Sequence, residues 1–153
     1  MAQEIASFAN ENRPMLDLTV HTDASVGVAA RGIDIVLIGA DLIDKSAAVS
    51  NKISLLSTIL TARYIAPQGK FVALSKKEKA LPFSPPGHEE TGHQEVTQVW
   101  GKHSASLKSP RRQVNVKNVY FEWVPADLID HYINKYGVAD SVGIARYARK
   151  LQR

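Results

Sequence analysis

An apolar run at residues 33–38 sets the fold class of this chain. It reads Ile-Asp-Ile-Val-Leu-Ile and ends in Gly39, Ala40 and Asp41. A near-continuous run of β-branched residues is typical of a strand that is buried on both faces of a parallel sheet. We therefore expect an α/β fold with Asp41 at the carboxyl end of a strand.

The segments on either side of this run predict alternating strands and helices. Residues 18–21 predict a strand, and residues 24–31 predict a short helix that a glycine closes. A second helix is expected over residues 51–65 with Ser50 as its N-cap, followed by a strand at residues 71–74. This order predicts two βαβ units, which are almost always right-handed.

The second half of the chain predicts a long connection followed by a strand and two helices. Residues 76–117 contain prolines, histidines and many polar residues but little periodicity, which is unusual inside a compact domain. Residues 119–123 predict a strand. Pro125 is expected to open a helix over residues 126–136, and residues 139–151 predict a basic terminal helix.

Composition limits the classes of function. A chain of 153 residues predicts one domain over residues 1–153, and the absence of cysteine excludes disulfides, thiolate metal sites and thiol nucleophiles within it. No apolar run approaches the ~18–20 residues of a membrane span, and no secretory signal is present, so a soluble cytoplasmic protein is expected. The net charge of +4 suits a phosphorylated small molecule or an acidic partner, and no direct contact with nucleic acid is expected.

The candidate site combines acidic residues at strand ends with polar residues at a helix start. Asp23 and Asp41 follow two neighbouring strands, and Gly39 keeps the backbone small there. Asn51 and Lys52 would begin the next helix, where free amides favour an anion. A carboxylic acid beside a phosphate-binding site is suited to proton transfer on a phosphorylated sugar. The alternative is structural, because a strand-end aspartate is often a turn residue and a first-turn lysine is often solvated.

Other cofactor sites have little support. His88, Glu89, Glu90 and His93 could hold a metal, but their spacing fits no standard helical zinc motif, and a solvated polar loop is the simpler interpretation. Glycine-rich dinucleotide and phosphate-loop fingerprints are absent. No metal and no cofactor is therefore expected.

Four motifs in a fixed order resemble the translation initiation factor 2B alpha/beta/delta family. This superfamily also contains methylthioribose-1-phosphate isomerase and ribose-1,5-bisphosphate isomerase. The motifs are Asp-Ile-Val-Leu-Ile-Gly-Ala-Asp at 34–41, Val-Ser-Asn-Lys-Ile at 49–53, Phe-Val-Ala-Leu-Ser at 71–75 and Asn-Val-Tyr-Phe-Glu-Trp-Val-Pro-Ala-Asp-Leu-Ile at 118–129. The resemblance covers residues 11–145 and implies a Rossmann-like C-terminal domain with a mainly parallel sheet flanked by helices.

The resemblance also implies roles for individual residues. In the isomerase branches, the aspartate at position 41 is the acid/base partner of a cysteine, and the pair at Asn51 and Lys52 helps to hold the ligand. Arg13, followed by a proline, belongs to the same substrate region. The family usually has glycine at the position of Ser54, and the side chain of this serine would crowd a bound phosphate.

Two further departures concern the extent of the domain. The chain has no cysteine, and the glycine-rich stretch that carries it in the family lies upstream of the matching part. The first βα unit also looks deleted, or the chain is a fragment.

Three hypotheses follow from the sequence. The favoured one is a regulatory or binding domain like the factor 2B subunits, which support guanine-nucleotide exchange in translation initiation. Such a domain would form homo- or hetero-oligomers with related subunits, bind initiation factor 2 and not be an enzyme as it stands. The alternative is a truncated aldose–ketose isomerase acting on ribose 1,5-bisphosphate or methylthioribose 1-phosphate. The third is a truncated paralogue without activity.

Overall fold

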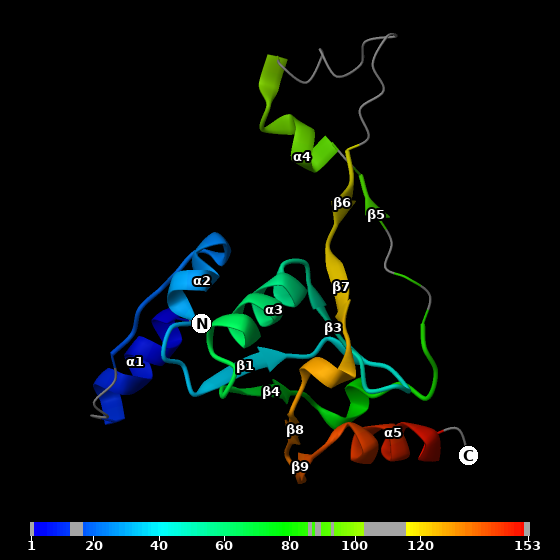
Figure 1. Cartoon of the computed structure of the whole chain (residues 1–153). Coiled ribbons are helices and arrows are strands. Elements are labelled where there is room, and N and C mark those ends of the chain that lie inside the picture. Colours follow the sequence, from blue (N-terminus) through cyan, green and yellow to red (C-terminus); the bar gives the residue numbers. More distant parts are fainter. Residues whose placement is uncertain are drawn as a thin grey trace.

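A computed structural model of the chain describes residues 2–12, 17–85, 87, 90–92, 94–102 and 116–151 (Figure 1). The longer helices are α1 (Ala2–Asn12), α3 (Leu55–Ile65) and α5 (Ser141–Lys150). The shorter helical segments are η1 (Asp23–Ser25), α2 (Val26–Ala29), η2 (Lys77–Lys79), α4 (Gln94–Gln98) and η4 (Ala126–Leu128). The strands are β1 (Ile35–Gly39), β2 (Leu42–Ile43), β3 (Val49–Lys52), β4 (Lys70–Leu74), β5 (Glu90–Thr91), β6 (Asn118–Val119), β7 (Phe121–Val124), β8 (His131–Asn134) and β9 (Gly137–Ala139).

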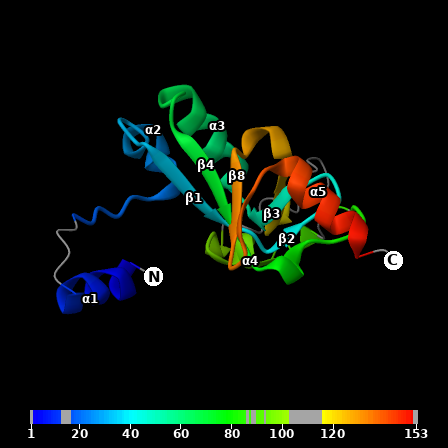
Figure 2. The same cartoon turned by 90° about the horizontal axis from the view of Figure 1, so that it is seen from below.

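The main sheet has four strands in the order β1-β4-β8-β9. Strands β1, β4 and β8 are parallel and lie side by side (Figure 2), and only β9 runs antiparallel to its neighbour. The carboxyl ends of β1 and β4 lie together because Gly39 pairs with Leu74 in the ladder. This is the mostly parallel α/β sheet that the sequence predicts.

A second, antiparallel sheet lies beside the first. Its strands follow the order β2-β3-β7, and β5 pairs with β6 in a separate two-stranded ribbon. Strand β2 follows β1 after only two residues, so the chain passes directly from the parallel sheet into the antiparallel one. The connection from β1 therefore leads to Asn51 through a tight β2–β3 turn.

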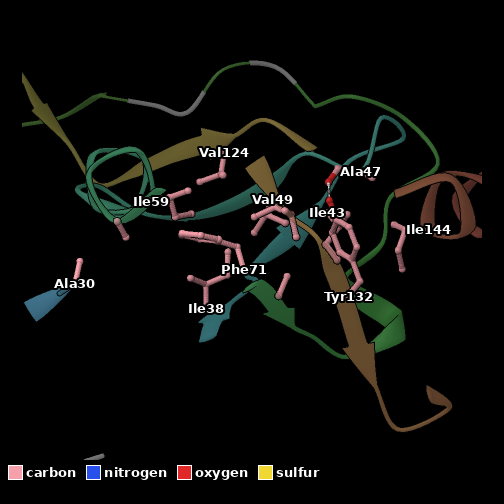
Figure 3. Close-up of a cluster of buried hydrophobic side chains, with 13 residues drawn as sticks. Ala30, Ile38, Ile43, Ala47, Val49, Ile59, Phe71, Val124, Tyr132 and Ile144 are labelled. Atoms are coloured by element: carbon pink, nitrogen blue, oxygen red, sulfur yellow. Dashed lines mark hydrogen bonds between the residues drawn. The ribbon is translucent and has the colours of Figure 1, made fainter. Parts of the chain in front are cut away.

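The core lies between the main sheet, helix α3 and the second sheet (Figure 3). Ile38, Ala73 and Tyr132 are in register on three adjacent strands and are all buried, so they form one face of the main sheet. Ile59 of α3 and Val49 of β3 cover this face. Burying a side chain of this size contributes about 1.5–3 kcal/mol to stability.

The expectation that the run at 33–38 is buried on both faces is wrong. Strand β1 is an edge strand, and its Ile35 and Leu37 side chains are 58% and 62% exposed on the face opposite the core. The apolar run identified the strand, but periodicity cannot distinguish an edge strand from a central one.

The expected helix at 51–65 begins later than predicted. Residues 49–52 form β3, which pairs with β7, and the helix begins at Leu55. Ser50 is therefore not its N-cap. Ser54 holds that position with φ of 84°, and the backbone N–H of Leu56 is capped instead by the carboxylate of Glu122 on β7, at 2.9 Å. A cap that comes from a residue 66 positions away cannot be predicted from local sequence.

The expected helix at 126–136 is also wrong. Only residues 126–128 are helical, and β8 and β9 follow as a hairpin closed at Gly137, whose φ is +125°. Tyr132 and Tyr136 are therefore not neighbours on a helix: the first is buried and the second is 68% exposed. Strand β8 is only four residues long, from His131 to Asn134, so the sequence offers too short a pattern to compete with the helix start expected at Pro125.

The remaining expectations are mostly confirmed. The strand at 71–74, the short helix at 24–31 and the terminal helix all form, and Gly32 has the positive φ of 72° expected at a helix end. The strand expected at 18–21 does not form, so β1 is the first strand in the described part of the chain. That the chain forms one domain with a long loop at 76–117 stays a prediction.

Candidate functional site

Asp41 stands directly after β1, at the carboxyl edge of the parallel sheet. Its backbone N–H donates to the carbonyl of Ser50 on β3 at 2.9 Å, which joins the strand end to the second sheet. The residue lines an open pocket of about 510 Å³, together with Gly39, Ala40, Leu74, Ser75, Lys76, Lys79 and Ile133. A carboxylate therefore shares one cleft with two ammonium groups at the place where α/β sheets bind ligands.

Asn51 lies against the end of β1. Its side-chain Nδ2 donates to the carbonyl oxygen of Gly39 at 2.5 Å, and its Oδ1 accepts from the N–H of Lys52 at 2.6 Å. A Cβ added at Gly39 would lie 3.4 Å from Asn51 Nδ2, so glycine allows this close approach. Asn51 thus fixes the backbone immediately before Asp41.

Lys52 is not at a helix start, which corrects the expectation from the sequence. It ends β3, and its Nζ lies 4.2 Å from the ring centroid of Phe121 and 5.6 Å from that of Tyr120. Within the described residues, no ion pair joins Lys52 to Asp41. The structure therefore brings Asp41, Asn51 and Gly39 together, while the ammonium of Lys52 packs over aromatic rings.

The basic residues that line the pocket with Asp41 are Lys76 and Lys79, which are not among the candidate site residues predicted from the sequence. Both follow β4 and line the pocket with Asp41. Their position after strand 71–74, which is parallel to the strand before Asp41, was the available signal, because the carboxyl ends of parallel strands meet at one edge.

A buried aspartate holds the β2–β3 turn between Asp41 and Asn51. Asp44 is 7% exposed, and its Oδ1 accepts from the backbone N–H and hydroxyl of Ser46 at 2.7 and 2.6 Å and from the N–H of Ala48 at 3.0 Å. Its Oδ2 accepts from Ser84 at 2.8 Å. Burial by itself raises the pKa of Asp44, but these hydrogen bonds outweigh it, so the pKa lies below its usual value.

The other sequence candidates lie elsewhere. Asp23 accepts a hydrogen bond from the hydroxyl of Ser54 at 2.9 Å, and neither residue lines the pocket of Asp41. Ser54 has the left-handed φ that glycine adopts freely, which accounts for glycine at this place in the family. Arg13, His88, Glu89 and His93 lie outside the described residues.

The described part of the chain contains neither a candidate metal site nor a candidate membrane span. No group of three or more His, Cys, Asp or Glu side chains there could hold a metal ion. None of its helices has the length and apolar character needed to cross a membrane.

Comparison with curated proteins identifies relatives that are named methylthioribose-1-phosphate isomerase. Two proteins named methylthioribose-1-phosphate isomerase, from Geobacillus kaustophilus and Bacillus mycoides, are 29% and 28% identical to this chain over 88% and 86% of its length. The chain spans 42% of the length of each of these curated relatives.

Solved structures with the same fold include two kinds of protein. A 5-methylthioribose 1-phosphate isomerase from Pyrococcus horikoshii matches with a TM-score of 0.67 and 21% identity, covering 90% of this chain and 38% of that one. The translation initiation factor eIF-2B from the same organism matches with a TM-score of 0.62 and 21% identity over 90% of this chain and 44% of that one. The family model described as "Initiation factor 2 subunit family" matches residues 9–141, and the chain therefore belongs to that family.

Proposed function

We propose that this chain is the sugar-phosphate-binding domain of an isomerase-type member of the family, and that Asp41 is its proton-transferring carboxylate. The observation that carries the proposal is the pocket in which Asp41 meets Lys76 and Lys79. A carboxylate can accept and return a proton, and ammonium groups bind phosphate through charge-assisted hydrogen bonds. The curated relatives named methylthioribose-1-phosphate isomerase support this branch over the regulatory one favoured from sequence.

The proposed chemistry needs only groups that move protons. An aldose–ketose isomerisation transfers hydrogen between two neighbouring sugar carbons, so the substrate and product have the same atoms. Asp41 would exchange a proton with the substrate while Lys76 and Lys79 hold its phosphate, and Asn51 would keep the backbone before Asp41 in place through its bond to Gly39.

A second acid/base group must come from outside this chain. The isomerases that the chain resembles use a cysteine, and the sequence contains none. We therefore expect the chain alone to bind methylthioribose 1-phosphate, or ribose 1,5-bisphosphate, without converting it. Conversion by the purified chain would contradict the need for the missing thiol.

The regulatory function is the second candidate, because the same lack of cysteine favours binding without turnover. The structural neighbours include a tetrameric eIF2B-beta2-delta2 complex from C. thermophilum, with a TM-score of 0.53 and 14% identity. On this hypothesis the chain assembles with related subunits and contacts initiation factor 2. Co-purification with those subunits, together with no binding of either sugar phosphate, would favour it over the isomerase branch.

Replacing Lys79 by alanine is expected to weaken binding of methylthioribose 1-phosphate by about tenfold, because one charge-assisted hydrogen bond to phosphate is lost. Isothermal titration of the purified chain measures this change. The matched control is Lys70→Ala, which removes the same charge from the opposite end of β4 and should leave affinity within about twofold. Equal losses in the two variants would indicate attraction by net charge alone and would contradict the assigned site.

A further inference from the structure

A second pocket lies on the opposite side of the β4 end, next to helix α5. It has a volume of about 190 Å³ and is separate in its lining from Asp41. Its floor is apolar, formed by the side chains of Ile43, Ala80 and Ile144, which are 1%, 5% and 5% exposed. Gly137 also lines the pocket, and an added Cβ there would meet no other atom within 4 Å.

Two tyrosines and a lysine form the wall of this pocket. The Nζ atom of Lys77 lies 4.3 Å from the ring centroid of Tyr147 on α5 and 4.9 Å from that of Tyr136 in the β8–β9 turn. The two rings therefore hold the ammonium group at the pocket wall. A lysine that is fixed in this way loses less side-chain freedom when it binds an anion.

Among the described residues, no ion pair involves the lysines around this wall. Lys76 also lines the pocket, and Lys135 joins Lys76, Lys77 and Glu78 around the adjoining cleft. Within the described ranges, the ion pairs are Arg63 with Asp130 and Lys117 with Glu90, so these lysines take part in none of them. One carboxylate among three ammonium groups leaves a net positive surface beside an apolar cavity.

We infer that this pocket is a second binding site, for a small anion that carries a single aromatic ring. The apolar floor and the tyrosine faces suit a planar ring, and the lysines suit its carboxylate or phosphate. The volume lies below the about 300–1,000 Å³ of pockets that hold larger ligands, which limits the occupant to one ring. The inference does not depend on the proposed isomerase function: Ser75 and Lys76 border both pockets, but Lys77, Tyr136 and Tyr147 line only the second of them.

Phenyl phosphate is the probe that tests this site, with phenol and inorganic phosphate as its two halves. Titration of the isotope-labelled full chain, followed by amide NMR shifts, is expected to move signals of residues 76–77 and 136–147. Because the ring and the charge act together, each half alone should bind about tenfold more weakly than phenyl phosphate. Equal binding of inorganic phosphate and phenyl phosphate, or shifts confined to residues 39–41 and 75–79 with none at residues 136–147, would overturn the inference.

Variants separate the roles of the ring and the charge. Lys77→Ala and Tyr147→Leu are each expected to weaken phenyl phosphate binding by about tenfold, while Tyr147→Phe retains the ring and should restore it. Lys150→Ala removes a charge from the end of the same helix and should change nothing, and circular dichroism verifies that each variant is folded. Unchanged affinity in Lys77→Ala would contradict the site.

Discussion

Replacing Tyr132 by alanine is expected to lower the free energy of unfolding by about 4 kcal/mol, a large part of the about 5–15 kcal/mol that holds a domain of this size together. The ring is fully buried at the centre of the core, and its hydroxyl donates to the carbonyl of Ala47 at 2.6 Å (Figure 3). The substitution therefore leaves a cavity and an unpaired buried carbonyl. Urea unfolding followed by circular dichroism measures the loss.

Tyr132→Phe separates the two contributions. It keeps the ring but removes the donor to Ala47, so it should cost about 1–2 kcal/mol. Burial and the nearby charge of Asp44 raise the pKa of the Tyr132 hydroxyl, which therefore keeps its proton and remains a donor at neutral pH. Equal stability of the phenylalanine variant and the wild type would show that the hydroxyl does not hold the β2–β3 turn.

Replacing Asp44 by alanine is expected to cost about 3 kcal/mol, because the four hydrogen bonds that this buried carboxylate accepts are lost, including those from the backbone N–H groups of Ser46 and Ala48. Ser84→Ala is the matched control: it removes only one of these bonds and should cost about 1 kcal/mol. The same urea unfolding experiment measures both. If the two variants lose the same amount, the turn does not depend on the backbone donors that Asp44 accepts.

The pH dependence of stability follows from the same carboxylate. The pKa of Asp44 is lower in the folded protein than in the unfolded chain, where it is about 3.9, so the stabilisation is complete above that value and is lost as the pH falls through the folded pKa. Asp130 contributes to the pH dependence of stability over the same pH range. Burial by itself raises the pKa of Asp130, but the hydrogen bond from the N–H of Phe71 and the guanidinium of Arg63 outweigh burial. The pKa of Asp130 therefore lies below its usual value.

Asp44→Asn should accordingly flatten the fall in stability between about pH 5 and pH 2 without abolishing it, because Asp130 still titrates. Unfolding free energies of the wild type and this variant at a series of pH values test the expectation. A slope in the variant that matches the wild type would contradict the account of Asp44.

Sequence patterns predicted strand β1 before Asp41 and strand β4 because β-branched and other apolar residues follow one another in short runs there, although β1 is an edge strand with one exposed face. They failed where tertiary contacts decided the structure. The stretch from Asn51 to Ile65 has helical spacing, but Asn51 and Lys52 pair with β7, and Glu122 from that strand caps the helix. Pro125 is a favourable residue for starting a helix. Tyr132 nevertheless lies in strand β8, because burial of its side chain outweighs the local preference for a helix.

The candidate site was also predictable in part, because some of its residues lie at the ends of strands that the sequence predicted. Asp41, Gly39 and Asn51 come together because they adjoin strand ends that the resemblance also marks. Lys79 was missed because a lysine-rich segment after a strand looks like ordinary surface until the sheet order is known. The predicted βαβ unit already implied that the ends of β1 and β4 meet, so the position of Lys79 after β4 was a signal that the sequence contained.

Amide NMR shifts of the isotope-labelled chain can locate bound methylthioribose 1-phosphate and so test whether Asp41, Lys76 and Lys79 form the binding site. We expect saturable shifts concentrated at residues 39–41 and 75–79, with the signals of Lys52 and Tyr120 little changed. Absence of binding, or shifts centred on Lys52 and Tyr120 instead, would contradict this assignment of the site.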